Sequence, residues 1–303
     1  MELIWIPISV LGALMQAVRT AGQKSLNTRL STMVTTYVRA FFGMPLLLVY
    51  LWAVKSGTGQ PFPDFHATFL LYSLGASVAQ VAGTVLLIKL FTLRNFAVGS
   101  TLIKTDTMIT AIIGSIFFSE VISGTGWIAV ALTLTGVVLI SVARARLKAF
   151  ALQGGGGFET WKPTLVGLGS ALSFCFSYLF LREASLSLGD NDFLIRAACT
   201  VISVTGMQVV FLGLWLLYRE PEGLKAMFPD WRLCGFIGVT SAIGSICWFT
   251  AMTLENASYV RSVGQVEAIF TLLISTLYFK ERLNAAELVG IAVIVAGVLL
   301  FLV

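Results

Sequence analysis

Residues 281–300, ERLNAAELVGIAVIVAGVLL, repeat residues 120–139, EVISGTGWIAVALTLTGVVL, at a constant offset. The correspondence runs without a gap from 89–142 to 250–303 and pairs Glu120 with Glu281 and Gly136 with Gly297. Each copy has the pattern of a hydrophobic helix, a short turn that bears an acid, and a second hydrophobic helix. Hydrophobic helices repeated within one chain are typical of secondary transporters, whose halves form a binding site between them.

The composition excludes an ordinary soluble domain. Of the 303 residues, 57% are hydrophobic and 12% are charged, against about 45–50% and about 25% in soluble proteins. Apolar runs of about 20 residues are long enough to cross the roughly 30 Å hydrocarbon layer. Most of the basic residues behind the net charge of +5 flank these runs, so the charge does not indicate a nucleic-acid partner.

The sequence predicts an all-α integral membrane protein with ten transmembrane helices in two inverted five-helix repeats. The first repeat is 1–143, a basic Gly-rich linker is 144–162, and the second repeat is 163–303. An odd number of helices in each half makes the second half enter the membrane from the opposite side. The expected spans are 3–23, 32–54, 66–91, 95–118, 124–143, 163–188, 192–218, 232–254, 257–279 and 285–303.

The glycine run 154–157 in the linker is not followed by the Lys-Ser/Thr of a phosphate-binding loop, so we interpret it as a flexible connection. The cysteines have no metal-ligand spacing, and His66 lies alone beside Pro63 and Asp64. We therefore expect no cofactor and no metal site. The four cysteines, which we expect to pack as small apolar residues, are Cys175, Cys199, Cys234 and Cys247.

Basic residues predict the orientation, because they gather in cytoplasmic loops. The even-numbered connections clearly hold only Lys55 and Arg182. We expect a multi-pass protein of the plasma (inner) membrane with both termini on the non-cytoplasmic side. The odd-numbered connections hold Lys24, Arg29, Lys89, Arg94, Arg144, Arg146, Lys148, Lys162, Arg219, Lys225, Arg232, Lys280 and Arg282.

The repeated turn and helix resemble the EamA-type branch of the drug/metabolite transporter superfamily, and the stretch 266–282, VEAIFTLLISTLYFKER, supports the resemblance. The resemblance implies ten helices in two inverted repeats and efflux of metabolites, amino acids or drugs. It matches Glu267 to a family Glu-Pro pair, and Glu281 and Arg282 to a Gly-Glu-Arg turn. Ala268 replaces the expected proline, which puts a kink there in doubt. The resemblance also implies cytoplasmic termini, against the charge pattern, which we follow.

Among the ionisable residues inside the expected spans, seven are candidates for function, because each is costly there and should face the interior of the bundle. The repeat aligns Asp106 with Glu267 and Arg39 with Arg196. Equal depth suggests structural ion pairs between Arg39 and Asp106 and between Arg196 and Glu267, unless the acids couple protons or contact the substrate. The remaining three are Arg19, Lys104 and Arg261.

If those pairs form, the unpaired charge is positive, which favours a substrate with a carboxylate or phosphate. We expect Lys104 and Arg261 to bind that anionic group between the halves, while Arg19 either joins them or reaches to the headgroups. Tyr178 and Trp248 are alternatively packing or interfacial residues. The other residues expected to contact the substrate are Gln265, Gln80, Trp248, Gln16 and Tyr178.

The sequence therefore predicts a secondary exporter of small polar, zwitterionic or anionic metabolites that works by alternating access. The expected partners are a small-molecule metabolite and membrane lipids, with the proton as candidate coupling ion, in a monomer or weak oligomer. A flippase-like or channel-like subunit that moves lipid-linked headgroups or small solutes is the alternative. An enzyme is not expected, because the sequence offers no clustered catalytic residues at membrane depth.

Overall fold

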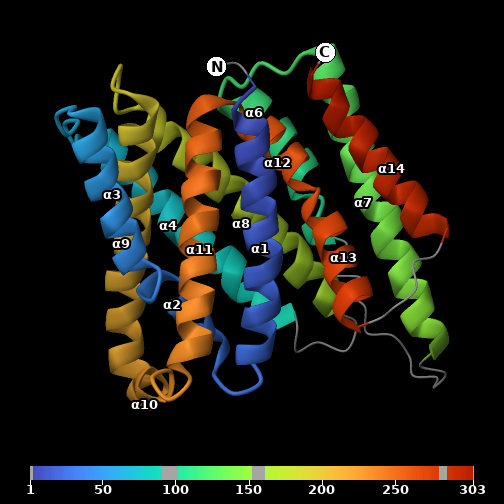
Figure 1. The fold of residues 1–303 in the computed structure, drawn as a ribbon, viewed down its shortest axis with the longest axis horizontal. Helices are drawn as coiled ribbons and strands as arrows, with labels where there is room; N and C mark the ends of the chain where they lie inside the picture. Colours follow the sequence, from blue (N-terminus) through green and yellow to red (C-terminus); the bar gives the residue numbers. More distant parts are fainter. Residues whose placement is uncertain (1–2, 91–101, 152–160, 280–284, 303) are drawn as a thin grey trace.

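The computed structural model describes residues 3–90, 102–151, 161–279 and 285–302, which form helices and their connections. Figure 1 shows the helices side by side in one bundle with both chain termini at the same end. The helices are α1 (Trp5–Leu26), α2 (Thr32–Phe41), α3 (Met44–Thr58), α4 (Ala67–Leu90), α6 (Asp106–Phe117), α7 (Gly124–Ala151), α8 (Trp161–Leu186), α9 (Phe193–Arg219), α10 (Pro221–Ala226), α11 (Trp231–Leu254), α12 (Ala257–Gly264), α13 (Glu267–Phe279) and α14 (Ala285–Leu299), followed by the 3₁₀ turn η1 (Leu300–Leu302).

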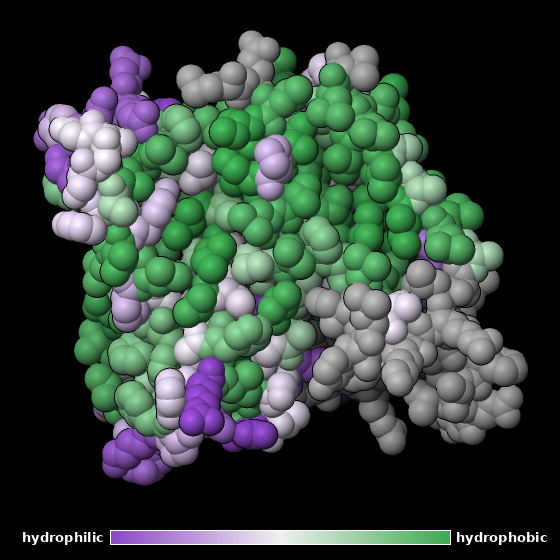
Figure 2. All heavy atoms as spheres, viewed as in Figure 1, coloured by the Kyte–Doolittle hydropathy of each residue, from purple (hydrophilic) through white to green (hydrophobic). Residues whose placement is uncertain are grey.

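The exterior of the bundle is apolar. Trp52, Leu71 and Leu214 each expose more than half of their surface, and hydrophobic residues cover most of the middle of the face in Figure 2. Within the described residues, seven helical segments are long and apolar enough to cross a membrane, and Asp106–Phe117 is a shorter apolar helix. The protein is thus an all-helical, multi-pass membrane protein, while ten spans stay a prediction.

The main helix contacts join one half of the chain to the other. The pattern of these contacts stays the same when the two halves are exchanged. In the predicted repeat, α1 corresponds to α8 and α4 to α11. Accordingly, α1 packs along α11 and α4 packs along α8, while α7 packs along α14 and α3 along α9.

Glycines allow the closest of these contacts. A Cβ atom on Gly136 of α7 would lie 2.7 Å from the carbonyl oxygen of Gly290 in α14. Its repeat partner Gly297 meets Thr133 of α7, with a Cβ-to-nitrogen distance of 3.0 Å. Both approaches are too close for a side chain, so this helix pair depends on glycine on both sides.

Within the described residues, three of the predicted spans are interrupted. The span 32–54 breaks at Phe42 and Gly43 between α2 and α3, and the span 257–279 breaks at Gln265 and Val266 between α12 and α13. At the second break the amide nitrogen of Val266 donates to the carbonyl of Val263 over 3.1 Å. This bond reaches back three residues instead of four, so the turn is tightened without a proline.

The same turn occurs at the equivalent point of the first half. There the amide nitrogen of Thr105 donates to the carbonyl of Leu102 over 3.1 Å, and α6 begins at Asp106. The two repeat-related acids, Asp106 and Glu267, are therefore the first residues of α6 and α13. A carboxylate in the first turn of a helix is favoured by the helix dipole.

The bounds of the predicted fifth span, 124–143, match the candidate membrane segment Gly124–Ala143, and the α7 helix continues eight residues beyond it to Ala151. The glycine run 154–157 and the family turn with Glu281 and Arg282 lie outside the described residues. The domain boundaries at 143 and 163 stay predictions.

Candidate functional site

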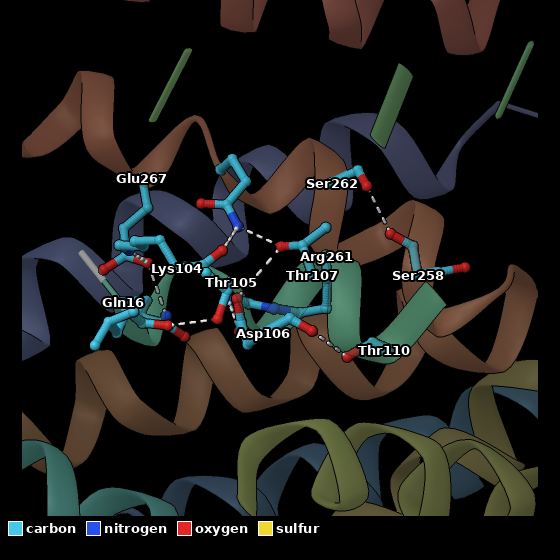
Figure 3. A network of polar contacts seen from close by, with 12 residues as sticks. Gln16, Lys104, Thr105, Asp106, Thr107, Thr110, Ser258, Arg261, Ser262 and Glu267 are labelled. Atoms are coloured by element: carbon cyan, nitrogen blue, oxygen red, sulfur yellow. Dashed lines mark hydrogen bonds and ion pairs between the residues drawn. The ribbon is translucent and has the colours of Figure 1, made fainter. Parts of the chain in front are cut away.

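Two ion pairs, one buried and one partly buried, join the helix breaks of the two halves (Figure 3). Arg261 Nη2 lies 2.9 Å from Asp106 Oδ2, and the two side chains are only 3% and 2% exposed. Lys104 Nζ lies 3.1 Å from Glu267 Oε2. Each pair takes its acid from the start of one half-helix and its base from the segment before the other, so the two pairs cross between the halves.

The predicted ion pairs are therefore wrong. Arg39 does not reach Asp106, because its Nη2 donates to Gln80 Oε1 over 2.6 Å and to Gln208 Oε1 over 3.3 Å. Arg196 does not reach Glu267, because its Nη1 donates to the carbonyl of Gly189 over 3.2 Å. Equal depth in the membrane does not make two side chains face each other.

The prediction that Lys104 and Arg261 are the unpaired cations is also wrong. Within the described part of the chain, Arg19 of α1 makes no hydrogen bond or ion pair, although its side chain is buried and its Nε is shielded from solvent. It lies within electrostatic range of Glu267, Tyr178 and Arg261. A buried guanidinium without a carboxylate partner is costly in a membrane interior, which marks Arg19 as a candidate functional residue.

Two aromatic rings hold the guanidinium of Arg261. Its Cζ lies 4.6 Å from the ring centre of Tyr178 and 5.0 Å from that of Trp248, which are cation–π distances. Glycines place the indole: a Cβ atom on Gly264 would lie 2.5 Å from it, and one on Gly12 3.2 Å. The interfacial alternative for Tyr178 and Trp248 is thus wrong, since both rings are buried in the interior.

Several polar atoms around Arg261 have no partner among the described residues. They are Nε and Nη1 of Arg261, Nε1 of Trp248 and Oε1 of Gln265. All but the last are hydrogen-bond donors, and each is buried. Donors that surround buried cations favour an acceptor-rich, anionic group.

Glutamine side chains complete the network. Gln16 Nε2 donates to Glu267 Oε2 over 2.9 Å, and Gln265 Nε2 donates to the hydroxyl of Thr107 and to the carbonyl of Lys104. Gln80 lies apart, in the cluster with Arg39 and Gln208. The structure thus brings together around the helix breaks Lys104, Arg261, Gln265, Gln16, Tyr178, Trp248, Asp106 and Glu267.

The sequence interpretation missed a second polar cluster at the start of α12. Glu120 accepts hydrogen bonds from the amide of Ala257 at 2.7 Å and from the hydroxyl of Ser258 at 2.9 Å. Arg182 donates to the carbonyl of Met252 over 2.8 Å, and its Nε lies 3.6 Å from Glu120. The repetition of Glu120 as Glu281 was the available signal, because a repeated acid in a short turn suggests a helix cap.

Comparisons with known proteins agree with this architecture. A solved structure titled only as the crystal structure of a protein superimposes with a TM-score of 0.73 over 99% of this chain and 96% of its own, at 12% identity, which supports the fold alone. An uncharacterised transporter of Synechocystis sp. is 25% identical over 255 residues, 81% of this chain and 74% of the relative. The EamA-like transporter family profile matches twice, over residues 3–142 and 161–303. The chain is therefore a member of the EamA-like transporter family, and it is a membrane transporter.

Proposed function

We propose that the protein is a secondary transporter that exports small zwitterionic or anionic metabolites, amino-acid-like in their charge, by alternating access. Family membership supports transport over catalysis. The observation that carries the substrate class is the buried guanidinium of Arg19, which has neither an ion pair nor a hydrogen bond within the described residues.

The balance of buried charge supports an anionic group on the substrate. Asp106 neutralises Arg261, and Glu267 neutralises Lys104. Arg39 keeps its charge, but three side-chain oxygens from Thr84, Gln80 and Gln208 accept its hydrogen bonds. Among the buried cations of the described residues, Arg19 alone makes no hydrogen bond or ion pair, so it is the cation that gains most from a substrate carboxylate.

The surroundings of Arg19 fit the rest of an amino-acid-like molecule. The indole N–H of Trp248 and the free N–H groups of Arg261 can donate to the same carboxylate. Gln265 Oε1 is a buried acceptor without a partner in the described chain and could accept from a substrate ammonium. Gln265 lies at the break between α12 and α13, Arg261 is in the last turn of α12, and Trp248 packs against Gly264. Interrupted transporter helices bind substrates at such breaks.

The crossed ion pairs suggest how the two halves move. Each pair connects a first-half segment to a second-half segment, so any rocking of one half against the other must preserve or exchange these contacts. A substrate anion near Arg19 adds a charge to this cluster, and that charge can favour one arrangement over the other only by binding it more tightly.

Flux into liposomes that contain the purified protein tests this proposal. The panel should contain zwitterionic amino acids, organic acids, purines and sugar phosphates, with and without a pH gradient. The proposal expects saturable uptake of carboxylate-bearing compounds, accelerated by unlabelled substrate on the opposite side. Flux that neither saturates nor responds to trans substrate would indicate a pore, and movement of lipid headgroups alone would indicate a flippase; either result refutes the proposal.

A further inference from the structure

A cavity of about 510 Å³ lies away from the ion-pair network, where α4 begins and α6 and α8 end. Phe117 ends α6, and Asp106, in the ion-pair network, begins it, so the helix separates the two places by roughly 16 Å at 1.5 Å per residue. The residues that line the cavity are Tyr72, Phe117, Phe118, Ser119, Phe180 and Glu183.

Contacts between the rings fix much of the aromatic wall. The ring centre of Phe180 lies 6.1 Å from that of Tyr72 and 5.8 Å from that of Phe118. Phe180 also packs on Gly75 of α4, where a Cβ atom would lie 2.9 Å from its ring. Since little can shift behind Phe180, this wall is already formed without a ligand.

Among the described residues of the lining, Glu183 is the single charged one, and no described residue forms a hydrogen bond or an ion pair with its carboxylate. The adjacent cation, Arg182, attracts the Glu183 carboxylate only through space, because its N–H groups are directed to Glu120 and to the carbonyl of Met252. A site that combines a carboxylate with aromatic rings attracts a cation both through the charge of the carboxylate and through the negative faces of the rings.

We propose that this aromatic cavity, with the Glu183 carboxylate in its wall, is a second binding site that takes an organic ammonium group carried on an apolar body. Its volume is in the range of small-molecule pockets and exceeds the need of a simple ion. The ammonium belongs either to a free amine or to a lipid headgroup, because Phe117 is 75% exposed on the apolar exterior.

Calorimetric titration of the purified full chain in maltoside micelles tests the site with benzyltrimethylammonium. The matched neutral probe is neopentylbenzene, in which carbon replaces the charged nitrogen. We expect saturable binding of the cation and at least about 10-fold weaker binding of the neutral probe, because only the cation gains from the carboxylate and the ring faces. Equal affinity for both probes, or no saturable binding of the cation, overturns the proposal.

Variants assign the binding to this cavity. Glu183→Gln should weaken cation binding about 10-fold or more, whereas Glu222→Gln, at an 82% exposed acid elsewhere, should leave it unchanged. Tyr72→Leu keeps an apolar wall but removes a ring, and should weaken the cation about 3-fold or more without weakening the neutral probe. Wild-type affinity in both Glu183→Gln and Tyr72→Leu overturns the assignment, and the second variant decides alone if the first does not fold.

Two further experiments distinguish the possible sources of the ammonium group and separate this proposal from the proposed transport function. In mixed micelles with phosphatidylcholine, competition with the probe identifies a lipid headgroup as the ligand, and undiminished binding identifies a free amine. Arg19→Gln should leave binding of the cation intact, because this site shares no residue with the network at the helix breaks. Failure of the transport proposal would therefore not affect this result; loss of cation binding in Arg19→Gln would overturn the independence of the second site.

Discussion

The buried pair of Arg261 and Asp106 predicts a large and specific loss of stability in Asp106→Leu. Leucine is larger than aspartate and apolar, and it removes the oxygen that lies 2.9 Å from Arg261 Nη2. Arg261 Nε and Nη1 already lack hydrogen-bond partners in the described chain, so the whole guanidinium would then depend on its two aromatic rings. Breaking one side of a buried pair costs roughly 3–5 kcal/mol.

Thermal unfolding in detergent, followed by size-exclusion chromatography with fluorescence detection, measures this loss. At about 2–4 °C per kcal/mol for chains of a few hundred residues, Asp106→Leu should lower Tm by about 10 °C. The double variant with Arg261→Leu should recover most of the loss, because removal of both charges leaves no unpaired cation. The double variant with Arg39→Leu is the matched control and should recover nothing. Recovery with Arg39→Leu, or none with Arg261→Leu, would refute the reasoning.

Three other predictions follow from single contacts. Gly136→Val should push α7 away from Gly290 of α14 and lower the free energy of unfolding by about 1–3 kcal/mol. Gly124→Val is the matched control and should change Tm little, because its Cβ would meet open space. Equal changes in Tm in the two variants would contradict the close packing of α7 on α14. Glu120→Gln should cost about 1.5–3 kcal/mol, since a charged acceptor is lost at the start of α12; an unchanged Tm would contradict the capping role. A cysteine in the linker 144–162 should resist membrane-impermeant reagents in intact cells, and rapid labelling would reverse the predicted orientation.

The sequence predicted an all-helical membrane protein with two repeats because the signal is collective. Long apolar segments and an internal repeat indicate membrane helices and two related halves, whatever any single residue does. The break at Gln265 and Val266 was harder to predict, since its usual sign, a proline, is absent at Ala268. The helix is interrupted by backbone hydrogen bonds that reach back three residues, and no residue type in the sequence indicates them.

The predicted pairing of charged residues was wrong for a geometric reason. The repeat gives the depth of each ionisable residue, but the direction of its side chain depends on how the helices rotate and where they break. Arg39 and Asp106 have similar depth, yet Arg39 faces the glutamines of α4 and α9. The cavity at Glu183 was invisible in the sequence, because its wall combines three helices and most of its residues pass for packing residues.

The sequence predicted an excess of buried positive charge on Lys104 and Arg261. In the described part of the structure the unpaired buried charge is on Arg19 instead. This difference arises because Arg261, and not Arg39, contacts Asp106. Once Asp106 is engaged there and Glu267 is engaged by Lys104, both acids in this network are occupied.

The most direct measurement compares the transport of a carboxylate substrate with that of its neutral amide analogue in wild-type protein and in Arg19→Gln. A hydrogen bond to a charged group is worth about 1.5–3 kcal/mol, so the wild-type preference for the carboxylate in kcat/KM should be about 10-fold or more. Arg19→Gln should lose most of that preference while keeping transport of the amide, and Arg196→Gln, near the start of α9, should keep the preference. An unchanged preference for the carboxylate in Arg19→Gln would contradict the assignment of Arg19 as the group that binds the substrate anion.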